Sequence, residues 1–412
     1  MALQQDFTGA GKGPLQANQM TDESYISLHR HDNVDALALK GAPEGVDLPY
    51  CLQQIKGWQT ACRKLPRWAE VEGLVFPPSL SMEQCSSQPT AAYKQALVER
   101  LLPPGRRKAM ADLTGGLGVD FSHLAPLFHE AHYVECQPGL CHTARHNLPL
   151  LGLAHATVHQ TDSTAFAASM PEMDLVYADP ARRDADGRRT VWLEHCTPDL
   201  TQLLPLLEGR TSLLLVKLSP MLDIARALQQ LRGVAEVHVV SVEGECRELL
   251  LAIIPGHEGR PVFHCAELGR HPYSFCGTLP EPVREGTSTL QHYLFEPGAA
   301  LLKAGMQDAA CTRWQLHKLH PNSHLYTGSL PLPHYPGRMF CVADCYSFSK
   351  QDLKRLRERL PQANLTVRNF PATVVDLRKR LKLKEGGHDY LFATTLADGR
   401  RVLIHCQRPS AT

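Results

Sequence analysis

The sequence predicts an α/β protein whose middle part is a parallel, doubly wound sheet closed by an antiparallel hairpin. From Arg107 onward, five short apolar segments alternate with segments of helical pattern, which is the order that a parallel sheet covered by helices requires. The last two apolar segments are separated by only a few residues. That connection is too short for a parallel crossover, so they must pair antiparallel.

The individual elements follow from these patterns. We expect parallel strands at 110–113, 132–135, 157–160, 174–178 and 211–218, and the closing hairpin at 236–241 and 247–254. Helices are expected up to about Phe128, at 139–151 and at 222–231. Six parallel strands would instead indicate a dinucleotide-binding fold.

Other segments flank this sheet. The expected divisions are a disordered lead (1–32), an N-terminal helical region (33–104), the sheet domain (105–256), a small α+β piece (257–310) and a basic α+β domain (311–412). In the last, we expect strands at 338–342 and 365–368, helices at 350–360 and 374–383, and a hairpin at 390–395 and 401–406.

Charge is unevenly distributed, although the formal net charge is only +1. From Cys311 to the end, the chain has 17 Lys and Arg but only 7 Asp and Glu. The rest of the chain has 26 Lys and Arg and 35 Asp and Glu. A basic module on an acidic body is typical of proteins with an anionic partner, although an ordinary solvated surface has the same composition.

Composition also excludes several classes of protein. No apolar run reaches the roughly 20 residues that span a bilayer, and the first thirty residues lack the apolar core of a secretory signal. The 13 cysteines include no CxxC pair. We therefore expect a cytoplasmic protein with reduced thiols, no membrane contact and no metal.

The most informative segment is Asp112-Leu113-Thr114-Gly115-Gly116-Leu117-Gly118-Val119-Asp120, where a strand is expected to give way to a helix. Glycines there let the backbone approach a ligand at a helix N-terminus. A nicotinamide site would need a third glycine where Phe121 stands. Asp112, at the strand end, suits a positively charged ligand such as a sulfonium with an amino group. A plain strand-to-helix turn is the alternative.

Polar residues also end the following strands. Glu135 ends the second, where a carboxylate can bind both hydroxyls of a ribose, and Asp162 follows the third, where it can accept from an adenine amine. These positions lie at the carboxyl edge, where open α/β sheets bind ligands.

The fourth and fifth strands end in candidate catalytic residues. Asp179 and Pro180 follow the fourth strand, and an Asp side chain with a neighbouring carbonyl can orient an exocyclic amine. Lys217 ends the fifth strand, where it can position a base or neutralise a phosphate. Arg182 and Arg183 are either phosphate contacts or solvated loop charges.

A cation cluster marks the C-terminal domain. Arg378, Lys379 and Arg380 begin a seven-residue run with five cations, and Phe370 lies nearby in the sequence. Cations interleaved with an aromatic residue favour a single-stranded RNA surface, although a solvated helix face has the same pattern.

With these residues in place, the middle of the chain resembles Rossmann-like class I S-adenosylmethionine-dependent methyltransferases. More narrowly, it resembles a bacterial group that joins this domain (105–256) to a ferredoxin-like insert (257–310) and a C-terminal THUMP-like domain (311–412). The resemblance covers roughly residues 35–410. Its markers are Ser81–Ser87, Asp112–Gly118, Asp179–Arg182, Leu294–Ala300, Leu319–Ser323 and Arg378–Gly387.

The resemblance implies S-adenosylmethionine as the cofactor. By similarity, Asp112, Gly116 and Gly118 would bind its methionine end, Glu135 its ribose and Asp162 its adenine. The other expected cofactor-binding residues of the loop are Thr114, Gly115 and Asp120. Thr114 stands where the family commonly has its first glycine.

The resemblance also implies a substrate. N-methyltransferases carry Asp/Asn-Pro-Pro-aromatic at this position, whereas this chain has Ala181 and Arg182 after Asp179-Pro180. The aromatic normally stacks on a flipped base, and Tyr177, Trp192 or the Arg182 guanidinium are the candidate replacements. THUMP domains deliver structured RNA, so we expect direct in-line methylation of a base nitrogen in tRNA or rRNA.

Three alternatives remain. The enzyme could methylate a protein or a small molecule, or the chain could bind cofactor and RNA without turnover. A dehydrogenase is disfavoured by Phe121 and by the terminal hairpin. No cysteine lies at the fourth-strand motif, which disfavours a covalent pyrimidine-C5 mechanism.

Overall fold

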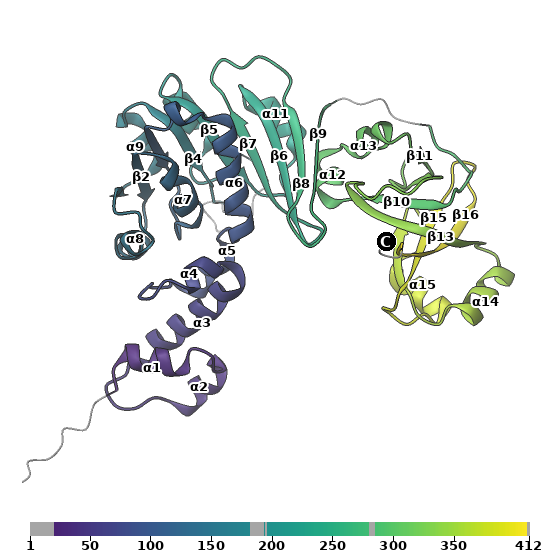
Figure 1. The fold of residues 1–412 in the computed structure, drawn as a ribbon, viewed down its shortest axis with the longest axis horizontal. Coiled ribbons are helices and arrows are strands. Elements are labelled where there is room, and N and C mark those ends of the chain that lie inside the picture. Colours follow the sequence, from purple (N-terminus) through teal and green to yellow (C-terminus); the bar gives the residue numbers. More distant parts are fainter. Residues whose placement is uncertain (1–19, 182–192, 194–195, 280–284, 410–412) are drawn as a thin grey trace, which may run out of the picture. The chain divides into compact units, whose positions relative to one another are not determined.

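The computed structural model describes residues 20–181, 193, 196–279 and 285–409, and its fold is mixed α/β (Figure 1). Its strands form a nine-stranded and a seven-stranded sheet. The chain divides into two compact units. One holds the chain up to Gln88 with residues 116–122 and 137–154, and the other holds the remainder, including both sheets.

The nine-stranded sheet has the order β3-β2-β1-β4-β5-β7-β6-β8-β9. Its first seven strands in sequence are β1 (Ala109–Asp112), β2 (Glu130–Glu135), β3 (Ala156–Gln160), β4 (Met173–Ala178), β5 (Thr211–Leu218), β6 (Val234–Val242) and β7 (Glu245–Ile253). β1 to β5 are parallel, and β7 lies antiparallel between β5 and β6. The predicted class I methyltransferase sheet with its antiparallel terminal hairpin is confirmed.

The sheet continues beyond its expected end. β8 (Val262–Glu267) pairs parallel with β6, and β9 (Tyr273–Thr278) pairs antiparallel with β8. β10 (Tyr293–Pro297) belongs to the other sheet. Residues 257–310, expected as one small α+β piece, are therefore shared between two sheets.

The second sheet has the order β11-β12-β10-β13-β16-β15-β14. Its other strands are β11 (His317–Lys318), β12 (Tyr326–Gly328), β13 (Gly337–Ser347), β14 (Asn364–Arg368), β15 (Asp389–Thr395) and β16 (Arg401–Gln407). Helices α14 (Lys350–Arg359) and α15 (Val374–Leu381) share a leucine-rich core with β14, β15 and β16. The strands, helices and hairpin expected after residue 337 are all present.

The helices between the strands of the first sheet are short. They are α7 (Val119–Leu124), α8 (Pro138–Leu150), α9 (Ser163–Ser169), α10 (Leu200–Leu207) and α11 (Ile224–Gln230). Two further helices, α12 (Ala299–Ala304) and α13 (Gln307–Arg313), lie between β10 and β11 of the second sheet in the chain. The core of this sheet gathers leucines and valines of β4 to β7 with residues of α10, α12 and α13. Within the part of the chain that the structure describes, no helix is long and apolar enough to cross a membrane.

The N-terminal region is helical, as expected. It contains α1 (Asp22–His29), α2 (Val34–Lys40), α3 (Leu48–Lys64), α4 (Pro66–Ala69), α5 (Ser79–Gln84) and α6 (Gln88–Leu101). α1 corrects the prediction of a disordered lead, because Thr21 caps this helix and Tyr25 is buried in a cluster with Leu37 and Ile55.

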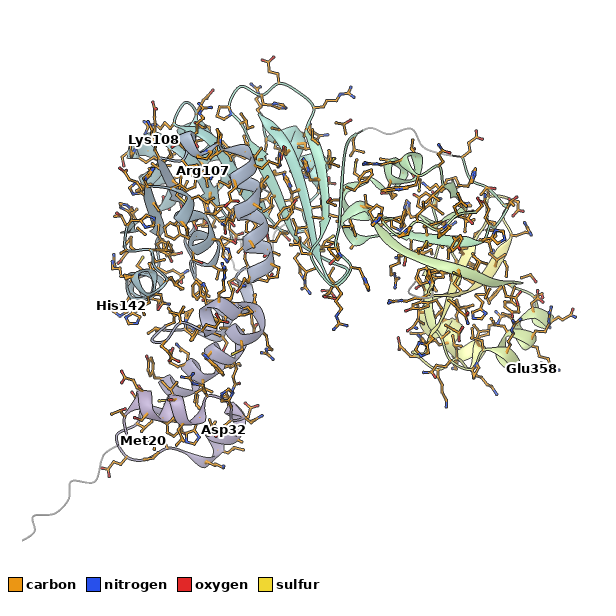
Figure 2. The ribbon with its side chains drawn as sticks, in the orientation of Figure 1. Met20, Asp32, Arg107, Lys108, His142 and Glu358 are labelled. Carbon is orange, nitrogen blue, oxygen red and sulfur yellow. The ribbon has the colours of Figure 1, made fainter. Side chains whose placement is uncertain are left out.

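Helix α6 is attached to the first sheet by several side-chain contacts. The Lys94 ammonium forms a buried ion pair with Glu248 on β7. At its C-terminal end, the Arg107 guanidinium donates to the carbonyls of Glu99 and Leu102, both at 2.7 Å. A cation at this end complements the helix dipole. Arg107 and Lys108 (Figure 2) lead directly into β1.

Candidate active site

The carboxyl ends of the parallel strands carry the predicted polar residues. Asp112 ends β1, Glu135 ends β2 and Lys217 lies next to last in β5. Asp179 follows β4 directly, and Asp162 lies two residues beyond β3. Because the strands are parallel and hydrogen-bonded in the order β3-β2-β1-β4-β5, all five residues lie at one edge of the sheet.

A hydrogen-bond chain connects three of these strands. The Asp112 carboxylate, which is 1% exposed, accepts the backbone N–H of Thr114 at 2.9 Å and its hydroxyl at 3.3 Å. The same hydroxyl oxygen accepts the backbone N–H of Asp179 at 2.6 Å. The Asp179 carboxylate in turn accepts from the Lys217 ammonium. The ends of β1, β4 and β5 are thus held by side chains as well as by strand pairing.

The ion pair at the end of this chain has one sheltered and one accessible member. The Lys217 side chain is 12% exposed, whereas that of Asp179 is 37% exposed. The carboxylate is therefore the member that a substrate could reach, and the ammonium fixes its orientation. The next residue, Pro180, is buried.

Glu135 lies in a sheltered position with a thiol beside it. Its side chain is nearly buried, and the Cys136 thiol donates to Oε1 at 3.4 Å. Burial, together with the nearby Glu135 carboxylate, raises the pKa of the Cys136 thiol. Cys136 is therefore a hydrogen-bond donor to Glu135, a role that sequence reasoning missed.

Asp162 is the N-cap of α9. Its carboxylate accepts the backbone N–H groups of Thr164 and Ala165. The hydrogen bond from the Thr164 hydroxyl is the main cause that lowers the pKa of Asp162. The next residue, Ser163, donates its hydroxyl to the carbonyl of Leu113 at 2.6 Å, which ties the start of α9 to the end of β1.

The glycine-rich loop begins with a close contact. Gly115 donates its N–H to the carbonyl of Val134 at 2.9 Å, and a Cβ at this position would lie 2.3 Å from the fully buried ring of Tyr133. Only glycine fits there. In the other compact unit, Gly116 and Gly118 have φ of 56° and 86°, a backbone region that favours glycine.

That same unit shows how Asp120 is held. The buried Ser86 hydroxyl donates to its carboxylate at 2.7 Å. Ser86 belongs to the Ser81–Ser87 marker, and sequence reasoning gave it no role because it lies 34 residues from its partner.

Some expected contacts are not formed or cannot be placed. Tyr177, a candidate to stack on a base, is 1% exposed within β4 and offers no open face. Arg182, Arg183 and Trp192 lie outside the described residues. Ala181 is exposed and forms a bridge with Thr197.

The predicted basic cluster lies on α15. Lys379 and Arg380 are exposed, and the Arg380 guanidinium lies 4.5 Å from the centre of the Phe348 ring. Arg378 is largely buried and is 3.3 Å from Glu385. Phe370 is only partly exposed and packs edge-on against Phe348. Two of the three cations therefore face outward, and the aromatic beneath them is Phe348.

Comparison with known proteins identifies the family. The structure matches the crystal structure of a "putative methyltransferase" from Porphyromonas gingivalis W83 with a TM-score of 0.80 and 33% sequence identity, covering 94% of this chain and 98% of that one. The chain belongs to this methyltransferase family. No curated protein matches the chain.

Two family models match the C-terminal part of this methyltransferase. A ferredoxin-like domain matches residues 293–336 and a THUMP domain-like model matches residues 337–408. The first range contains β10 to β12 with α12 and α13, and the second contains β13 to β16 with α14 and α15. Both matched domains contribute strands to the same seven-stranded sheet.

Other solved structures match a smaller share of the chain. The SAM-dependent methyltransferase from Agrobacterium tumefaciens is 17% identical, with 40% of this chain and 61% of that chain covered and a TM-score of 0.31. An rRNA methylase from Streptococcus thermophilus is 11% identical, with 40% and 94% covered and a TM-score of 0.30.

The contact between Gly115 and Tyr133 leads to a first prediction. Gly115→Ala should lower the free energy of unfolding by about 1–3 kcal/mol, because the added methyl group overlaps a ring that has no room to move. Gly105→Ala is the matched control, since nothing lies within 4 Å of its Cβ position. Chemical denaturation measures both, and equal stability of the two variants would contradict the packing argument.

Proposed function

We propose that this chain is an S-adenosylmethionine-dependent methyltransferase that methylates a nitrogen of a base in structured RNA by direct in-line transfer. The observation that carries the proposal is the hydrogen-bond chain from Asp112 through Thr114 to the Asp179–Lys217 pair. It joins the residues that suit a cationic cofactor to the residues that suit a substrate amine.

The carboxyl edge fits the cofactor chemically. S-adenosylmethionine carries an amino group, a sulfonium, a ribose diol and an adenine amine, and when bound it supplies an electrophilic methyl group. Asp112 provides a buried negative charge for the amino group, Glu135 an acceptor for the diol and Asp162 an acceptor for the adenine amine. Three carboxylates at successive strand ends match this pattern of donors.

Asp179 and Lys217 would act on the substrate. The Asp179 carboxylate accepts a hydrogen bond from the exocyclic amine, which directs the nitrogen lone pair toward the methyl group. Lys217 holds the carboxylate in that orientation. The bond from sulfur to the methyl carbon breaks as the bond from nitrogen forms, and the proton of the methylated amine leaves to water. Proximity and orientation supply most of the rate.

The C-terminal domain would hold the RNA. Lys379 and Arg380 are exposed on α15, and Arg357 of the adjacent α14 donates to the carbonyl of Arg380. Fixed cations near an aromatic ring suit phosphates and stacked bases. The THUMP domain-like match over residues 337–408 supports this assignment.

A second candidate is a protein that binds cofactor and RNA without turnover. Two observations favour it: Ala181 replaces the second proline of the amine-methylating motif, and Tyr177 is buried. Methylation of a protein or small molecule is the other alternative, and RNA binding separates it from both.

Cofactor binding is the first test. By calorimetry, S-adenosylmethionine should bind the wild type and NADH should not, because the loop lacks the third glycine of the dinucleotide pattern. Gly116→Arg should abolish binding, since an arginine cannot adopt φ of 56° without strain and fills the loop. Gly105→Arg, in open space, should bind as the wild type does. No binding to the wild type would overturn the cofactor assignment.

Catalysis is tested at the ion pair. Asp179→Asn and Lys217→Met should keep S-adenosylmethionine binding and reduce methyl transfer to cellular RNA by about 100-fold or more. The control is Glu172→Gln, an exposed carboxylate just before β4. Transfer of radiolabelled methyl groups is the readout. Unchanged rates in both variants would exclude this pair from the reaction, and absence of transfer by the wild type would favour the silent protein.

RNA binding is tested on α15. Lys379→Gln with Arg380→Gln should weaken binding and flatten the slope of log K against log salt by roughly 1.4, because each neutralised phosphate of a single strand adds about 0.7 to that slope. Lys354→Gln with Arg355→Gln removes the same charge from exposed positions of α14. Equal weakening by both pairs would show that net charge alone, and not α15, attracts RNA.

A further inference from the structure

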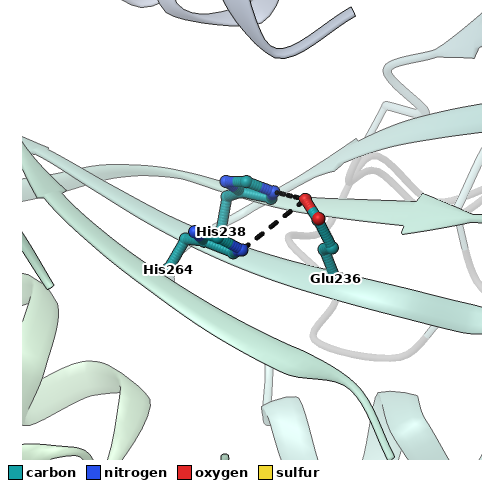
Figure 3. Close-up of side chains that lie close together, drawn as sticks. All are labelled: Glu236, His238 and His264. Atoms are coloured by element: carbon teal, nitrogen blue, oxygen red, sulfur yellow. Dashed lines mark hydrogen bonds and ion pairs between the residues drawn. The ribbon is translucent and has the colours of Figure 1, made fainter. Parts of the chain in front are cut away.

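Away from the candidate active site, three potential ligands share one face of the first sheet. Glu236 and His238 are two residues apart on β6, and His264 lies directly opposite His238 on β8. Their ligand atoms all lie within 4.8 Å of one another. Figure 3 shows the two imidazole rings stacked, with a ring nitrogen of each facing the carboxylate.

The two histidines differ in their hydrogen bonds. The Nε2 atom of His238 is 2.8 Å from Glu236 Oε2, and its Nδ1 is 2.8 Å from the Tyr93 hydroxyl. The Nε2 atom of His264 is 3.7 Å from the same carboxylate oxygen, too far for a hydrogen bond. This nitrogen is buried and has no hydrogen-bond partner among the described residues.

We propose that Glu236, His238 and His264 form a zinc-binding site that ties β8 to β6. Two imidazoles and one carboxylate are a common zinc ligand set, and a water completes the tetrahedron. Bond lengths of about 2.0–2.2 Å place tetrahedral ligand atoms about 3.4 Å apart. The separations of 2.8 Å and 3.7 Å from Glu236 to the two rings lie on either side of this value, and all three ligand atoms lie within 4.8 Å of one another, so side-chain shifts would bring them to one ion.

The groups around the site allow such an ion. The Tyr93 hydroxyl, on α6, fixes the orientation of the His238 ring from its Nδ1 side, as outer partners of metal ligands do. Arg100, also on α6, contacts both oxygens of Glu236. Its side chain is 49% exposed, so it can yield Oε2 to the ion and keep its 2.9 Å contact with Oε1.

Zinc binding to the full-length chain tests the proposal. After chelator treatment, the wild type should take up one equivalent that His264→Ala loses, with affinity falling at least about 100-fold. His159→Ala is the matched control, because His159 faces His132 at 3.0 Å in a histidine pair that belongs to no three-ligand group among the residues that the structure describes. Co²⁺ should give the visible bands of a tetrahedral nitrogen and oxygen site. Sulfur charge-transfer bands would place the ion on cysteines and overturn the proposal.

Arg100→Gln keeps the test decisive if His264→Ala fails to fold. Removing the competing guanidinium should tighten zinc binding about tenfold, whereas a plain hydrogen-bond network would bind no zinc in either form. Equal zinc uptake by the wild type and a folded His264→Ala would also overturn the proposal. S-adenosylmethionine binding should be the same in all these variants, so failure here is distinct from failure of the proposed function.

Discussion

The Thr114 hydroxyl is the link on which the candidate active site depends. It donates to Asp112 and accepts from the backbone of Asp179, so it joins the end of β1 to the residue after β4. A glycine, which the resemblance leads us to expect at this position, would offer no such group. Thr114 therefore adds a fixed side-chain connection between the end of β1 and the residue after β4.

Much of the fold could be predicted because apolar strands alternate with helices at regular intervals. The prediction of the fold failed where strands and helices no longer alternate regularly. β8 and β9 extend the first sheet because β8 pairs with β6, more than twenty residues earlier in the sequence, and β9 pairs with β8. No local sequence pattern indicates which sheet such a strand joins. Helix α1 was missed because only Tyr25 of its eight residues is buried, which leaves no apolar periodicity to recognise.

The positions of site residues could be predicted where they depend only on where a strand ends. Asp112, Glu135, Asp162, Asp179 and Lys217 all lie at the expected edge. The supporting residues Ser163 and Cys136 were not predictable, because no spacing rule describes their contacts with the Leu113 carbonyl and the Glu135 carboxylate. The expectation of no metal rested on cysteine spacing, which says nothing of two histidines brought together by strand pairing.

Strand register relates the candidate active site to the proposed zinc site. Lys217 on β5 is paired with Leu250 on β7, Leu250 with His238 on β6, and His238 with His264 on β8. Directly paired residues share a face, so the Lys217 and His264 backbones lie three strand spacings apart on one face, about 14 Å. The fully buried Leu250 separates the two polar groups. The outer strands can thus be held together by an ion without any ligand contacting the edge where β4 and β5 end.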